Sequence, residues 1–86
     1  MANNQELLNL ESELNCLKRE REILTNNFEA RRRNLLDQMR RSQSSQMNVQ
    51  LVNEIGQLNA EMRRTMDTME AKIFNARQAY FKKLRE

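Results

Sequence analysis

The chain has no proline, no histidine, no tryptophan and a single glycine among its 86 residues. Proline and glycine are the residues that most often break helices and bound short strands, so their near absence leaves few points of interruption. Good helix formers such as leucine, methionine, glutamate, glutamine, arginine and alanine occupy most positions instead. The composition predicts an all-α chain that forms one small domain, residues 1–86.

The same absences remove most catalytic and metal-binding chemistry. The lack of histidine removes the commonest general base, and the sequence contains no glycine-rich phosphate loop. Cys16 is the one cysteine, which excludes an intrachain disulfide and the Cys/His spacing of a zinc site. We therefore expect no enzyme activity, no catalytic residue, no metal and no cofactor.

Long hydrophobic runs are also missing. No stretch approaches the ~20 apolar residues that a transmembrane helix needs, and the first residues lack the pattern of a secretory signal peptide. A single cysteine suits a reducing compartment. These observations predict a cytoplasmic protein without a transmembrane segment.

Two long stretches of apolar residues at helical spacing are present. Apolar side chains recur every three or four positions over 7–39 and again over 51–84, which is typical of amphipathic helices. The two stripes mirror each other about residue 45, so that Leu10 falls opposite Tyr80. The predicted core is the set of mirrored apolar positions: Leu10, Leu14, Leu17, Leu24, Phe28, Leu35, Met39, Leu51, Ile55, Leu58, Met62, Met66, Met69, Ile73, Ala76 and Tyr80.

A polar stretch, 42–48, separates the two stripes. Its serines and asparagine favour turns and helix caps. We predict an antiparallel two-helix hairpin, a coiled coil with helix 1 at about 4–41, a turn at about 42–48 and helix 2 at about 48–84. The alternative is one continuous helix about 120 Å long. The hairpin is favoured because the mirror centre coincides with the polar stretch.

Three residues depart from this simple pattern. Arg21 falls opposite Met69 and Arg32 opposite Leu58, where polar residues would fix the register or the choice of partner. Gly56 lowers the helix propensity of its segment, and we expect a neighbouring segment to approach closely there.

The hairpin is too small to bury all of its apolar residues. Two helices supply little core, so self-association or a partner is expected. A second group of apolar residues lies outside the mirrored set and is the predicted partner or dimer interface: Leu7, Leu8, Cys16, Ile23, Phe74, Phe81 and Leu84. The predicted assembly is a dimeric four-helix bundle, or a complex with helices of another protein.

Arginines form a basic patch in the half of the hairpin nearer the turn: Arg31, Arg32, Arg33, Arg40, Arg41, Arg63 and Arg64. Consecutive arginines spread around a helix, and no aromatic residue among them could stack on bases. The net charge of +3 is too small to require a polyanion. Nucleic acid is therefore a minor alternative as partner.

The sequence thus predicts a non-enzymatic protein–protein interaction module. Its function would be that of a small coiled-coil adaptor or helix-holding chaperone, which buries the amphipathic helix of a partner. The alternatives are a self-assembling structural coiled-coil protein and a basic helical nucleic-acid binder.

Overall fold

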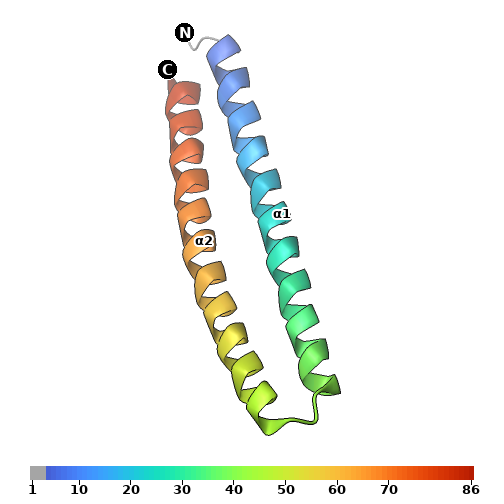
Figure 1. The fold of residues 1–86 in the computed structure, drawn as a ribbon. Helices are drawn as coiled ribbons and strands as arrows, with labels where there is room; N and C mark the ends of the chain where they lie inside the picture. Colours follow the sequence, from blue (N-terminus) through green and yellow to red (C-terminus); the bar gives the residue numbers. More distant parts are fainter. Residues whose placement is uncertain (1–3) are drawn as a thin grey trace.

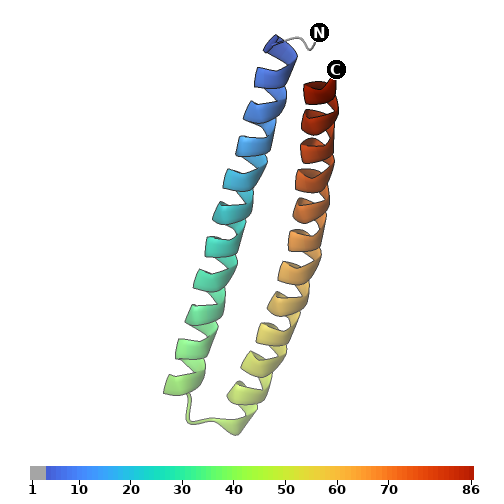
Figure 2. The same ribbon diagram turned by 180° about the vertical axis from the view of Figure 1, so that it is seen from behind.

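The protein is an antiparallel hairpin of two long helices. A computed structural model describes residues 4–86, in which α1 spans Asn4–Arg41 and α2 spans Ser45–Arg85. The helices lie side by side, and the beginning of α1 and the end of α2 lie at the same end of the molecule (Figures 1 and 2). The molecule measures 66 × 15 × 10 Å. The predicted all-α hairpin is confirmed, and the single continuous helix is excluded.

The turn closes without glycine and is shorter than the sequence predicted. Residues 42–44 connect the helices, so the predicted turn at 42–48 and the predicted start of helix 2 near 48 were wrong by about one helical turn. Ser44 is the N-cap of α2, with extended backbone angles of φ −93° and ψ 123°, and its Oγ accepts a hydrogen bond from the Met47 amide. The Ser42 Oγ accepts a further hydrogen bond from the Ser44 amide at 3.3 Å. Because Ser44 caps α2, residues 45–48 are helical and do not belong to the turn.

Contacts between the helices define their register. Arg21 contacts Glu70 and Thr25 contacts Met66, each one residue from its mirror position about residue 45. Nearer the open end, Lys83 pairs with Glu6, one residue to the other side of its mirror position. The helices therefore pack in the alignment that the mirrored apolar residues indicate.

The core is one continuous seam between the helices, and the two helices contribute to it unequally. In the described chain α1 supplies one buried side chain, Phe28, whereas α2 supplies Leu51, Leu58, Met69, Ile73 and Ala76. Ile73 is the most deeply buried of these, at 1% exposure. The other residues of the predicted core are half-buried: Leu10, Leu14, Leu17, Leu24, Leu35, Met39, Ile55, Met62, Met66 and Tyr80. A two-helix seam leaves one flank of each of these side chains uncovered.

The two arginines predicted at seam positions differ in the structure. Arg21 is half-buried and reaches across to Glu70. Arg32 is exposed and lies on a shallow surface with Glu29 and Leu36, so its predicted position opposite Leu58 in the seam was wrong.

Gly56 has no close neighbour within the hairpin. A Cβ atom added at this position would meet nothing within 4 Å. The expectation of a close approach is therefore wrong for the single chain, and the glycine faces open space on α2.

Candidate interaction surface

The half-buried leucines of α1 form one flank of the candidate surface. Leu10, Leu14 and Leu17 lie in the half of α1 nearer the chain ends, beside the buried Ile73 and Ala76 of α2. Leu17 and Ala76 line a shared open groove between the helices. A further helix laid along this groove would cover apolar area that the hairpin leaves in water.

The predicted interface residues lie mostly on the outside of the hairpin. Leu8, Ile23, Phe74 and Leu84 are each more than half exposed. Phe81 is exposed at 44% and packs edge-to-face on Tyr80, with 5.7 Å between ring centroids. The helical periodicity places Ile23 on the outward face of α1 and Phe74 on the outward face of α2, so these residues do not form one patch.

Of the remaining two members of the predicted interface, one is half-buried and one is exposed. Leu7 is half-buried near the open end of the seam. Cys16 is an exposed thiol on α1.

Sequence reasoning underestimated the apolar surface near the turn. Leu36, Met47, Val49 and Val52 are exposed large hydrophobic residues, with Val49 at 62%. The exposed apolar residues therefore extend to both ends of the hairpin. Val49 could have been found from its spacing, because it lies seven residues before Gly56 on the same helix face.

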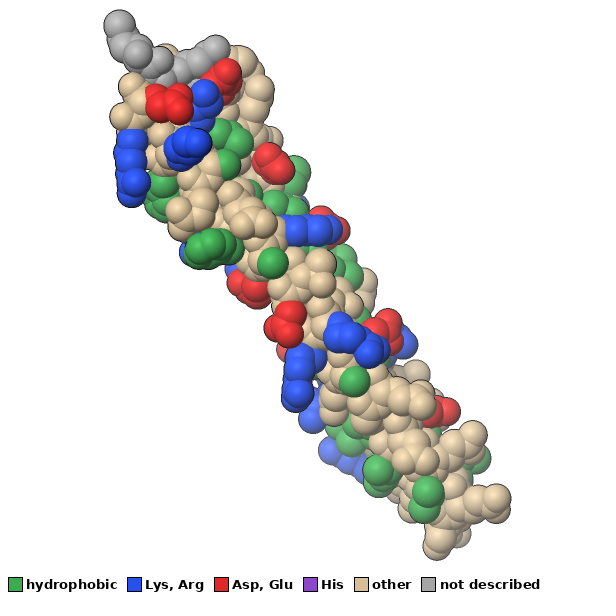
Figure 3. Space-filling model, turned by 90° about the vertical axis from the view of Figure 1, so that its left-hand side faces the viewer, with side chains coloured by type: hydrophobic (Ala, Val, Ile, Leu, Met, Phe, Trp, Pro, Cys, Tyr) green, Lys and Arg blue, Asp and Glu red, His purple; other side chains and the backbone are tan. Residues whose placement is uncertain are grey.

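The outward face of α2 carries hydrophobic and charged side chains together. Figure 3 views the hairpin from the α2 side and shows hydrophobic side chains along the length of this face, with basic and acidic side chains between them. No charged residue occurs in 42–53, so the part of α2 near the turn is uncharged and exposes Met47, Val49 and Val52. This face is mixed in character, as surfaces of reversible association usually are.

Carboxylates neutralise part of the basic patch. The Arg31 guanidinium stacks 5.7 Å from the centroid of the Phe28 ring and lies 3.9 Å from Glu61. Arg40 lies 3.8 Å from Asp37 one turn earlier. The remaining members of the patch, Arg32, Arg33, Arg41, Arg63 and Arg64, are exposed. The patch is therefore a set of dispersed arginines, two of them near carboxylates.

A salt-bridge cluster joins the two helices at the open end. The Lys83 ammonium lies 2.7 Å from the Glu6 carboxylate and 3.1 Å from that of Glu86. These hydrogen bonds, the one to Glu6 first, raise the pKa of Lys83 above its usual 10.5. The cluster holds the beginning of α1 against the end of α2.

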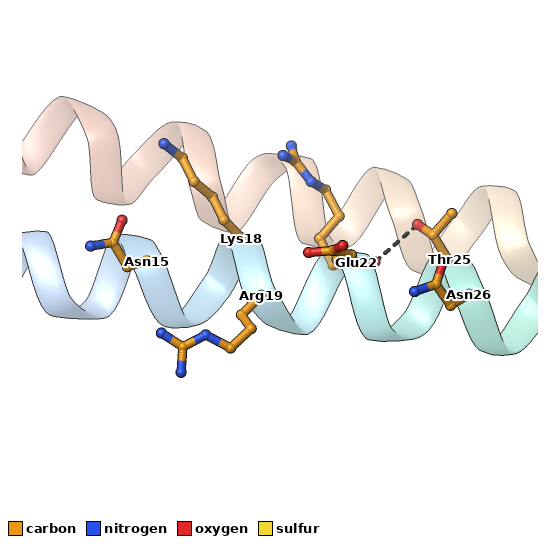
Figure 4. A pocket seen from close by; sticks show the side chains of 7 residues that line it. Asn15, Lys18, Arg19, Glu22, Thr25 and Asn26 are labelled. Atoms are coloured by element: carbon orange, nitrogen blue, oxygen red, sulfur yellow. Dashed lines mark hydrogen bonds between the residues drawn. The ribbon is translucent and has the colours of Figure 1, made fainter.

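One surface hollow, drawn in Figure 4, is shallow and comes from one helix. Its lining, which includes Asn15, Lys18 and Glu22, belongs entirely to α1, and the Thr25 hydroxyl inside it donates to the Arg21 carbonyl (Figure 4). A binding or catalytic pocket needs polar groups that converge from several sides. Residues 4–86 contain no cluster of three or more candidate metal ligands. Neither helix in this part of the chain is long and apolar enough to cross a membrane.

Comparisons with protein-family models, with curated proteins and with solved structures found no match to this chain.

Proposed function

We propose that this chain is a non-enzymatic protein–protein interaction module. It acts as a small coiled-coil adaptor or helix-holding chaperone, and its hairpin is completed by helices of another chain. The exposed thiol of Cys16 suits a reducing compartment, and we place this activity in the cytoplasm.

The observation that carries the proposal is the surface area of the hairpin. The chain exposes 6835 Å² at a mass of 10.3 kDa, whereas a compact monomer of that mass exposes about 5,400 Å². The surplus of roughly 1,500 Å² exceeds the ~800 Å² that each partner buries in an interface of standard size. Association can therefore remove the surplus without unfolding the hairpin.

The mechanism is burial of apolar area against a second pair of helices or a single partner helix. The half-buried Leu10, Leu14 and Leu17 supply this area on the open flank of the seam, and the exposed Phe74 supplies it separately on the outward face of α2. Each Å² that leaves water contributes about 25 cal/mol before the ordering of side chains is subtracted. Flexible Met62 and Met66, both half-buried, can repack as a partner arrives.

Self-assembly into a structural coiled coil is the second candidate. It is favoured by the exposed hydrophobic residues that alternate with charged ones along the outward face of α2. The nucleic-acid alternative has less support, since Arg31 and Arg40 lie near carboxylates.

Sedimentation velocity combined with circular dichroism tests the proposal. A helical oligomer supports self-assembly, and a weakly helical monomer supports an adaptor that folds on its partner. A monomer that is fully helical and melts cooperatively would contradict the proposal, because such a hairpin needs no further chain.

A further inference from the structure

Exposed residues follow one line along the outward face of α2. Seven of them, hereafter the outer α2 stripe, are Val49, Gly56, Ala60, Arg63, Asp67, Phe74 and Phe81. At 3.6 residues per turn these positions fall within roughly 40° of one line, on the side of α2 away from the seam. The stripe is therefore available to another helix while the hairpin stays closed.

The outer α2 stripe is complementary to itself when it is reversed about the level of residue 65. Reversal places Phe74 on Gly56 and Phe81 on Val49, so each aromatic ring meets a small or β-branched residue. It also places Arg63 on Asp67, so a twofold axis at this level creates two opposite-charge pairs. Large groups meet small ones and opposite charges meet, as in a self-complementary interface.

Gly56 gives a specific reason for this pairing. A glycine inside a helix costs roughly 0.5–1 kcal/mol relative to alanine, and no other element of the hairpin occupies the space beside it. Phe74 lies further along the same face and is 57% exposed. The ring of a second copy would fill the space that the missing side chain leaves.

The charges along α2 favour the antiparallel orientation. Residues 45–67 carry the carboxylates of Glu54, Glu61 and Asp67 and two arginines. Residues 68–85 carry one carboxylate, Glu70, and five basic side chains: Lys72, Arg77, Lys82, Lys83 and Arg85. A parallel pair would bring the two basic ends together, whereas an antiparallel pair sets each basic end against the half that has more acidic than basic residues.

We propose that the partner of this hairpin is a second copy of the same chain, packed antiparallel along the outer α2 stripe. The inference rests on the second candidate function, self-assembly, and names the occupant of the surface. The turn of each copy lies beside the chain ends of the other, and the surplus area of the hairpin accommodates an interface of standard size.

Complementary charge variants test the pairing. Position 63 of each copy faces position 67 of the other. Arg63→Asp therefore makes both facing pairs acidic, and Asp67→Arg makes both pairs basic. Each variant should dimerise about tenfold more weakly than the parent chain. Mixing the two variants restores opposite charges at both pairs, so the mixed dimer should form about tenfold more tightly than either variant alone. Repulsion within each helix is unchanged by mixing and cannot produce this result.

A matched pair of variants tests which face is used. Phe74→Glu should weaken the dimer at least about thirtyfold, as expected for an aromatic anchor. Ile23→Glu is the control, because Ile23 has nearly the same exposure, 55% against 57%, but lies on the outward face of α1. This control should leave the dissociation constant within about twofold of the parent chain.

The outcomes separate this inference from the proposed function. If the mixed variants associate no better than each alone, or if Ile23→Glu breaks the dimer and Phe74→Glu does not, the stripe is not the interface and the proposed function stands. A weakly helical monomer likewise overturns the second copy as occupant but leaves the adaptor function. A fully helical monomer with a cooperative melt overturns both.

Discussion

Single residues decide where the apolar seam is interrupted. Arg21 occupies a seam position, yet its side chain remains 35% exposed because the guanidinium reaches Glu70 at 2.9 Å. Its aliphatic stem covers the seam while the charge stays near water. An exposed pair of this kind contributes about 0–1 kcal/mol to stability. The arginine therefore acts more by disfavouring other registers of the two helices than by stabilising the observed one.

Replacing this arginine by leucine should therefore stabilise the hairpin. We expect Arg21→Leu to raise the free energy of unfolding by about 1 kcal/mol, because apolar burial exceeds the lost ion pair. Urea titration followed by circular dichroism measures the change, and Glu70→Gln is the control that removes the pair alone. A net destabilisation by Arg21→Leu would show that the ion pair outweighs apolar packing at this layer.

Gly56 offers a second test at the same scale, in a background that keeps the chain monomeric. With Phe74→Glu present, Gly56→Ala should raise the helix content of the monomer at 222 nm, since it removes the roughly 0.5–1 kcal/mol cost of glycine and the added methyl group meets nothing in the hairpin. Ala60→Gly, one turn along the same face, should lower it by a similar amount. The idea fails if alanine at position 56 lowers the helix content of this monomer, because the space beside it would then be occupied.

At the scale of the element, the turn shows what capping adds to hydrophobic pattern. The apolar stripes indicate where the helices must pack, but they carry no signal between residues 39 and 51. Ser44 begins α2 there by bonding to the Met47 amide at 3.3 Å. The Ser42 amide closes the other side by donating to the Gln38 carbonyl at 2.9 Å.

Loss of the cap should weaken the hairpin at its closed end. Ser44→Ala should lower the free energy of unfolding by about 1 kcal/mol, because an amide at the start of α2 loses its acceptor. Thermal melts of the parent chain, Ser44→Ala and the neighbouring Ser45→Ala measure this effect. Equal losses in the two variants would mean that the cap does not set the start of the helix.

The sequence predicted the hairpin and its register, and the buried residues of the described chain all belong to the predicted core, but it did not predict how unequally the two helices contribute to that core. Mirrored spacing was sufficient for the alignment because Arg21 and Thr25 contact residues one place from their mirror positions. The exposure of Arg32 could not be predicted from spacing. A long side chain at the edge of the seam can turn outward to water. The start of α2 was placed too late because serine and asparagine favour both turns and caps.

For the whole molecule, the open end is held by charge as well as by packing. Lys83 joins Glu6 at the beginning of α1 to Glu86 after the end of α2, and its pKa is raised by both carboxylates. A raised pKa in the folded state means that the protonated lysine stabilises the hairpin. This stabilisation is complete below the usual value of 10.5 and is lost as the pH rises through the higher folded value.

The hairpin should therefore lose stability in strongly alkaline solution in a way that depends on Lys83. Unfolding free energies of the parent chain and of Lys83→Met, measured between about pH 9 and about pH 12, should differ at the lower pH and converge at the higher. Parallel curves for the two proteins would show that the cluster does not contribute to folding.

The hairpin as a whole buries its seam but leaves large hydrophobic side chains exposed on its outer surface. Its helices bury Ile73 and Met69 almost completely, yet leave Leu8, Phe74 and Leu84 more than half in water. A chain of this size gains little stability from one seam alone. We therefore predict that association with a second chain contributes to the stability of the folded hairpin.

The dependence of the melting temperature on protein concentration tests this claim most directly. Helix melting is followed at 222 nm over samples from about 1 to about 500 µM, because association makes the midpoint depend on concentration. The midpoint should rise by several degrees for each tenfold increase, since a tenfold change is about 1.4 kcal/mol of linkage. A sharp transition at one temperature in every sample would contradict the account, because it would show a hairpin that is stable alone.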